Sequence, residues 1–185
     1  MALTAAFTGP ATALSGVVGE WTGAITMSFA LTDQAVVANG VTPRSPAIAI
    51  GRKADGLAFL HYCLTDRQPE PTWGFVEPLG KADSNLLGNY HVTFGDGSSE
   101  MVEIRYGDNI TRPDLTYGED VASCPFWAQP AWEGRDREGR RVTLWAHEWV
   151  NPCPDKEIAR VSVFYTGTDP QEQIALLGLT ALTPR

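Results

Sequence analysis

The stretch from Tyr106 to Trp132 contains both aromatic rings and hydrogen-bonding side chains. In protein sites that bind sugars, an aromatic ring covers the apolar CH face of a pyranose, and polar side chains pair with its hydroxyl groups. Both kinds of side chain occur here, so this stretch is a candidate sugar-binding segment. The candidate ligand-binding residues are Tyr106, Asp108, Asn109, Tyr117, Trp127 and Trp132, together with Trp73 from an earlier loop.

A structural explanation competes with this one. Asn109 could satisfy backbone groups at a turn, and the tryptophans could fill the ends of a folded core, with Trp73 acting as a hydrophobic lid. Several aromatic residues in one irregular loop exceed what core filling requires, which favours a binding role for the set as a whole.

Catalytic templates fail on this chain. His147-Glu148 begins like a zinc-protease motif, but Asn151 stands where the second histidine is required, and the segment has the pattern of a strand. His61 and Cys63 share a strand face, yet two ligands do not make a metal site, so a buried, hydrogen-bonded histidine is the favoured interpretation. Asp108 and Glu148 could hydrolyse a glycoside only at a carboxylate separation that a sequence does not supply. We therefore predict no catalytic residues.

The candidate residues follow a hairpin that the sequence predicts between Gly88 and Ile110. Its first arm alternates, with Tyr90, Val92 and Phe94 on one face, and its second arm alternates in the same way. The residues Gly95-Asp-Gly-Ser98 between the arms offer tight-turn chemistry. Two such strands cannot bury their apolar faces alone, so other strands and a second layer must complete the structure.

Further strands are predicted on both sides of this hairpin. Pro46–Gly51 and Leu57–Leu64 read as a second hairpin, in which the nearly continuous apolar run of the latter indicates a central strand covered on both faces. Arg141–Val150 and Glu157–Thr166 read as a third hairpin across a proline-rich turn. Gln173–Leu182 is assigned as the closing strand, with a helix as the rival assignment because Ala, Leu and Gln favour helices.

The predicted fold class is all-β, an antiparallel two-sheet β-sandwich. Length and composition favour one domain over residues 1–185, with a loosely specified N-terminal segment at 1–24. The formal net charge of −8 argues against nucleic acid or an anionic membrane as partner, because clustered Lys and Arg bind both. No apolar run approaches the roughly 20 residues that cross a bilayer, and no signal peptide is recognisable, so we expect a soluble protein, either secreted or cytoplasmic.

The three cysteines exclude a dense disulfide framework. Cys63 falls in an apolar strand and is predicted to be a buried thiol. Cys124 and Cys153 could pair only if the fold brings their Cα atoms within about 7 Å.

Five motifs occur in order along residues 46–182. They are Leu57-Ala-Phe-Leu-His61, Gly88-Asn-Tyr90 with Asp96-Gly97, Ile104-Arg-Tyr-Gly-Asp-Asn-Ile110, Ala131-Trp-Glu-Gly134, and Trp149-Val-Asn-Pro152 with Pro154 and Ile158. In this order they resemble the galactose-binding-like jelly-roll accessory domains that accompany catalytic modules in many bacterial carbohydrate-active enzymes.

The resemblance implies glycan binding by loops at one end of the sandwich, with a catalytic module of a larger enzyme as the other partner. It also implies a structural calcium ion, for which acidic loop residues such as Asp55, Asp66, Asp108 and Asp155 are candidate oxygen ligands. The alternative is a structural or homo-oligomerisation module whose loop aromatics pack against another chain. A small stand-alone glycan hydrolase is the least favoured reading.

Overall fold

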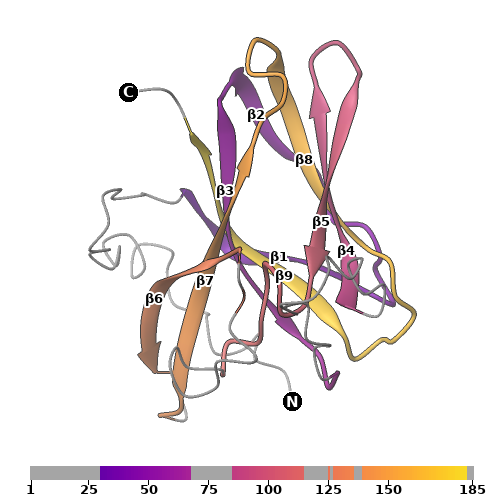
Figure 1. Cartoon of the computed structure of the whole chain (residues 1–185). Coiled ribbons are helices and arrows are strands. Elements are labelled where there is room, and N and C mark those ends of the chain that lie inside the picture. The colour runs from indigo at the N-terminus through magenta and orange to yellow at the C-terminus, as the bar shows by residue number, and fades with distance from the viewer. Residues whose placement is uncertain (1–29, 68–84, 115–124, 126, 136–138, 183–185) are drawn as a thin grey trace, which may run out of the picture.

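The computed structural model describes residues 30–67, 85–114, 125, 127–135 and 139–182, and the structural statements below concern these residues. Their strands form two antiparallel sheets that face each other (Figure 1). The five-stranded sheet has the order β1 (Ala30–Asn39), β9 (Gln173–Leu182), β3 (Gly56–Leu64), β7 (Arg141–Val150) and β6 (Gln129–Arg135). The four-stranded sheet has the order β2 (Ile48–Lys53), β8 (Glu157–Tyr165), β4 (Leu86–Phe94) and β5 (Ser99–Arg105). The predicted all-β, two-sheet sandwich is confirmed.

The central hairpin forms as its sequence predicts. β4 and β5 pair with Tyr90 opposite Val102 and His91 opposite Met101. The turn closes through the Phe94 amide, which donates to the Ser98 carbonyl at 2.9 Å, and Gly97 takes a positive φ of 85° that favours glycine. Tyr90 and Val102 are buried in the core, whereas His91 and Met101 lie on the outer face of the sheet.

The other two predicted hairpins are wrong, because each pair of strands is divided between the sheets. β2 pairs with β8, whereas β3 pairs with β7 and β9. The turn between β2 and β3 bonds to distant segments instead of closing a hairpin. The Asp55 amide donates to the Leu182 carbonyl at 2.7 Å, and the Asn151 side chain donates to the Ala54 carbonyl at 2.8 Å.

The proline-rich link between β7 and β8 is also a corner between layers. Asn151 holds this corner in place. Its side-chain Oδ1 accepts a hydrogen bond from the Cys153 backbone amide at 2.9 Å, and its backbone amide donates to the Asp55 carbonyl at 2.8 Å. The corners after β2 and after β7 are therefore hydrogen-bonded to each other. This arrangement sends β8 into the four-stranded sheet, where it pairs with β2 and β4.

Gln173–Leu182 is the strand β9, and its helix-favouring composition is overridden by pairing on both edges. It lies between β1 and β3, so its backbone groups have partners along both neighbours. The predicted central strand Leu57–Leu64 is confirmed as well, because β3 is flanked by β9 and β7 and is buried on both faces.

The core lies between the two sheets. Phe59 of β3 stacks on Tyr90 of β4 with ring centroids 4.0 Å apart, which joins the layers at their centre. A second apolar cluster, on the outer face of the five-stranded sheet, contains Leu60, Tyr62, Val142, Leu144, Ala175 and Leu177. No helix in the described part of the chain is long and apolar enough to span a bilayer.

Candidate functional site

The segment that follows β5 is bound into the sandwich by its own backbone and by Asn109. The Asn109 Oδ1 accepts the Arg105 amide at 2.9 Å, and its Nδ2 donates to the Glu103 carbonyl at 2.7 Å. Asn109 is buried, and both polar atoms of its side chain bond to backbone groups of the turn. This is the structural role considered for Asn109 above.

Residues 111–113 fill a gap between two strands of the five-stranded sheet. Direct pairing of β3 with β7 extends as far as His61 opposite Trp145. Beyond that pair, the Cys63 amide donates to the Thr111 carbonyl at 3.1 Å, and the Thr143 amide donates to the Pro113 carbonyl at 2.8 Å. The segment after β5 thus crosses from one sheet to the other and is held there by both β3 and β7.

Tyr106 and Asp108 lie within this anchored segment and are both buried. Tyr106 belongs to the core between the sheets, and its amide donates to the Asn85 carbonyl at 2.9 Å. The backbone carbonyl of Asp108 accepts the Trp127 amide at 2.7 Å. The structure therefore brings Tyr106, Asp108 and Asn109 together as a support, with Trp127 attached to it.

Trp127 combines a fixed backbone with an exposed ring. Its amide is bonded to Asp108, and its carbonyl oxygen accepts a hydrogen bond from His147 Nδ1 at 2.6 Å. Its side chain is nevertheless 74% exposed, and in the described part of the chain no other aromatic residue is exposed. Folding has fixed this backbone without covering the side chain.

The remaining aromatic candidates differ from Trp127. Trp132 on β6 is half-buried, packs against the outer apolar cluster and lies against Gly134, where a Cβ would overlap its ring. Tyr117 and Trp73 lie outside the described residues, as do the 1–24 segment and Cys124.

His147, which bonds to the Trp127 carbonyl, belongs to a group of four nearly parallel rings. His61 faces Tyr90 and His147, with ring centroids 5.9 and 6.3 Å away, and Phe59 stacks on Tyr90 and faces His147. The His61 Nε2 lies 2.7 Å from the Asn109 carbonyl, and its Nδ1 lies 2.6 Å from the Tyr90 hydroxyl. A carbonyl oxygen only accepts, so Nε2 carries the proton and Nδ1 accepts from Tyr90.

Electrostatics keep this ring group uncharged at neutral pH. Burial, and secondarily the nearby His147, lower the pKa of His61 to about 3, against a smaller raising effect of the Asn109 carbonyl. Burial also lowers the pKa of His147 and raises that of Tyr90 well above its ordinary value. His61 is therefore the buried, hydrogen-bonded histidine that the sequence favoured over a metal ligand.

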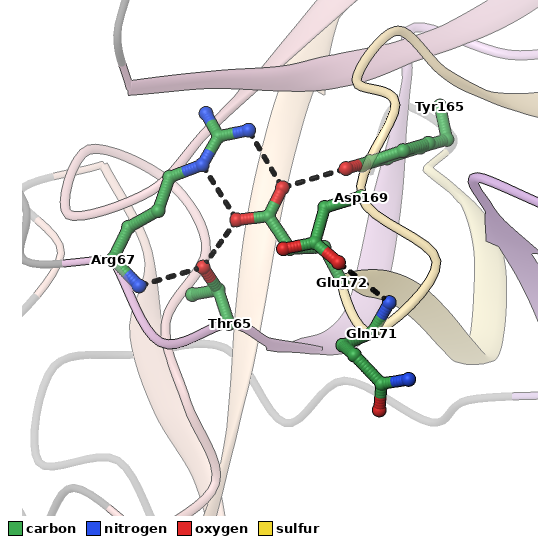
Figure 2. A network of polar contacts seen from close by, with 6 residues as sticks. All are labelled: Thr65, Arg67, Tyr165, Asp169, Gln171 and Glu172. Atoms are coloured by element: carbon green, nitrogen blue, oxygen red, sulfur yellow. Dashed lines mark hydrogen bonds and ion pairs between the residues drawn. The ribbon is translucent and has the colours of Figure 1, made fainter.

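Sequence reasoning missed a second polar cluster, which surrounds Glu172 (Figure 2). The Glu172 carboxylate accepts hydrogen bonds from Thr65 and Tyr165, both at 2.6 Å, and pairs with the Arg67 guanidinium at 2.5 and 2.6 Å. Glu172 is buried, and these contacts occupy both of its oxygens. The one available signal was a lone acidic residue immediately before the apolar run of β9.

The remaining candidate chemistry is limited. Cys63 is the predicted buried thiol, with a pKa raised chiefly by burial, and Cys153 is also a free thiol. Within the described ranges, no group of three or more His, Cys, Asp or Glu side chains could hold a metal ion.

What this arrangement can offer a ligand is a ring for stacking on a rigid support. Comparisons of the whole chain with protein-family models, with curated proteins and with solved structures find no match.

Proposed function

We propose that this chain is a non-catalytic carbohydrate-binding module, of the kind that accompanies glycoside hydrolases, and that Trp127 is its stacking platform. The observation that carries the proposal is the combination of a side chain that is 74% exposed with a backbone bonded at both its amide and its carbonyl. The indole presents a flat apolar surface to solvent, which is the surface that the CH face of a pyranose covers.

Rigidity matters because individual sugar contacts are weak. A binding group whose backbone is already ordered loses less conformational freedom when a ligand arrives, so more of the contact free energy remains as affinity. Asp108 and His147 supply this order at Trp127 from two different parts of the fold.

We further propose that the sandwich is a jelly roll of the galactose-binding-like kind. Support comes from the strand order, because β1-β9-β3-β7 and β2-β8-β4-β5 form two interleaved sets of four strands. The chain changes sheet between β1 and β2, β2 and β3, β3 and β4, β5 and β6, β7 and β8, and β8 and β9. Such double-sheet arrangements occur in lectin domains among many others, so this topology is compatible with the proposed binding role without identifying it.

The proposal is tested with a glycan array that carries neutral and acidic oligosaccharides, probed with the isolated chain in the presence and absence of a chelator. The strongest binders are then titrated against the protein and against Trp127→Ala. We expect the variant to lose about 1 to 3 kcal/mol of binding free energy. Its free energy of unfolding should change by no more than about 0.5 kcal/mol, since the ring is exposed.

Met101→Ala provides a matched control, because Met101 is 71% exposed but lies on β5 in the other sheet. It should leave glycan affinity unchanged. A Trp127→Ala variant with unchanged affinity and a stability loss of roughly 3 to 5 kcal/mol would instead make the ring part of the core. If Trp127→Ala converts a dimer to a monomer in sedimentation experiments, the oligomerisation alternative replaces the proposal.

A further inference from the structure

Two imidazole rings, one on β3 and one on β7, connect these strands to the segments that hold Trp127. His61 on β3 bonds to the carbonyl of Asn109, and His147 on β7 bonds to the carbonyl of Trp127. The same two segments bond to each other, since the Trp127 amide donates to the Asp108 carbonyl. The backbone of Trp127 is therefore fixed on its amide side by the segment that His61 anchors, and on its carbonyl side by His147 directly.

We infer that His147 is a positioning residue for ligand recognition by Trp127, an inference that rests on the proposed carbohydrate-binding function. The imidazole holds the Trp127 carbonyl, and this bond sets the direction in which the indole leaves the surface. His147 acts through Trp127 and needs no contact with the ligand itself.

The chemistry of the acceptor fixes the protonation of the ring. A carbonyl oxygen has no proton to give, so the 2.6 Å contact with Trp127 requires a proton on His147 Nδ1. The contact of His61 with the Asn109 carbonyl is made by the other nitrogen and requires a proton on Nε2. The two neutral histidines are consequently opposite tautomers, although their rings are parallel to within 6°.

This tautomer pattern can be measured without any ligand. Long-range ¹H–¹⁵N correlation spectra at neutral pH should show His147 protonated at Nδ1 and His61 protonated at Nε2. In a separate sample of the ligand-free variant His147→Ala, hydrogen exchange of the Trp127 amide should be faster than in the parent chain on the order of fivefold, the effect of losing one ordinary hydrogen bond. Protonation of His147 at Nε2, or unchanged exchange in the variant, would overturn the inference.

Rescue by a conservative variant separates positioning from general destabilisation. The side-chain Nδ2 of asparagine can donate from nearly the position of the imidazole Nδ1. His147→Asn should therefore retain the affinity of the parent chain for methyl β-D-galactopyranoside and for the strongest oligosaccharide from the array, whereas His147→Ala should lose on the order of fivefold. Val150→Ala is the control on the same strand, because Val150 is 81% exposed.

The possible failures are distinguishable. If the parent chain binds no glycan, the proposed function fails, and the tautomers and amide exchange alone decide whether His147 holds Trp127. If the parent chain binds glycan and His147→Ala binds it equally well, the positioning role is wrong while the proposed function stands. If Ala and Asn lose affinity equally, the imidazole contributes something other than its Nδ1 donor, and the inference is again overturned.

Discussion

Glu172 is a buried carboxylate held by three side chains from different parts of the fold. Thr65 and Arg67 follow β3, Tyr165 ends β8, and Glu172 itself immediately precedes β9. Burial and the bond to Glu172 raise the pKa of Tyr165 to about 12, so this hydroxyl remains a donor at neutral pH. Both oxygens of the Glu172 carboxylate are already bonded to protein groups. Glu172 is therefore suited to holding the ends of β3, β8 and β9 together, and not to chemistry on a ligand.

Replacing Glu172 by Gln should be strongly destabilising. The substitution keeps the shape of the side chain but removes the negative charge that Glu172 presents to Arg67, and it directs an NH₂ group at donors. We expect a loss of about 2 to 4 kcal/mol in the free energy of unfolding, below the upper range for buried pairs because Arg67 is partly exposed. Urea denaturation measures this loss.

Tyr165→Phe is the matched comparison, because it removes one donor and leaves the ion pair intact. It should cost about 1.5 kcal/mol, as expected for a hydrogen bond to a charged group. Equal losses in the two variants would contradict the importance of the charge at Glu172.

His61 should make the protein sensitive to acid. In the unfolded chain its pKa is near the ordinary 6.5, whereas in the folded protein burial lowers the pKa to about 3. Because the unfolded state binds the proton more tightly, the stabilising contribution is fully present above pH 6.5 and is lost as the pH falls toward 3. The slope from this one group is at most about 1.4 kcal/mol per pH unit.

The comparison of His61→Phe with the parent chain isolates this effect. At pH 7 the variant should be less stable, because the Tyr90 hydroxyl and the Asn109 carbonyl lose their partner. Between pH 6.5 and 4, however, its unfolding free energy should fall less steeply than that of the parent chain. Parallel pH profiles from urea titrations would show that His61 does not carry the acid sensitivity.

Residue chemistry was predictable from the sequence only where the partners are local. The turn role considered for Asn109 is visible in its neighbours Glu103 and Arg105, and the failure of the zinc motif at Asn151 needs no structure. The bond between His147 and Trp127 is different, since twenty residues separate the two and nothing in either segment specifies which ring nitrogen donates. Exposure also could not be assigned, and Trp127 and Trp132 had the same status before their environments were known.

Strand contacts also set limits on substitution, and Gly88 on β4 is the clearest case. A Cβ at this position would overlap the backbone carbonyl oxygen of Phe164 on the paired strand β8. Backbone atoms cannot move aside as a flexible side chain can, so Gly88→Ala must separate the two strands locally. We expect a cost of about 3 kcal/mol or more in thermal or urea unfolding.

Gly97→Ala is the control for the general cost of replacing a glycine. A Cβ there meets no atom within 4 Å, and only the positive φ of 85° opposes the substitution. A cost of about 1 to 2 kcal/mol is expected. If Gly88→Ala proves no more damaging than Gly97→Ala, close approach of β4 and β8 is not what requires glycine.

The three predicted hairpins show which elements a sequence specifies. The β4–β5 hairpin is correct because its turn chemistry and its strand alternation are both local. The turns after β2 and β7 also contain turn-favouring residues but are corners, and their residues bond to distant partners such as Leu182 and Ala54. Which sheet a strand joins depends on those distant contacts. The alternation of residues therefore predicted where strands form, but the turn sequences did not predict which strands pair.

At the scale of the whole molecule, the resemblance to accessory domains predicts a structural calcium ion held by loop oxygens. If the protein binds calcium in this way, the ion stabilises the folded state in proportion to its occupancy. A chelator should then lower the thermal midpoint, and added calcium should restore it. Circular dichroism measures the thermal midpoint in each case. A midpoint that neither treatment changes would contradict a structural calcium ion in this protein.

The two-layer architecture itself could be predicted because it depends on a count of amphipathic strands and not on their order. Period-two alternation in strands such as β4 requires a core on one side, and a strand buried along its whole length, such as β3, requires cover on both. The order β1-β9-β3-β7-β6 could not be derived in this way, since it joins strands from opposite ends of the described chain.

The place of β9 between β1 and β3 has a consequence for biosynthesis. β9 is the strand that pairs with β1, and it occupies one whole edge of β3, yet ribosomes complete it after every other described strand. The β4–β5 hairpin can close on the ribosome, whereas the edges of β1 and β3 stay open until β9 emerges, and open edges invite association with other chains. Formation of the five-stranded sheet must therefore wait until translation has passed β9, and slow elongation just upstream of β9 would prolong the time during which a nascent chain needs chaperone protection.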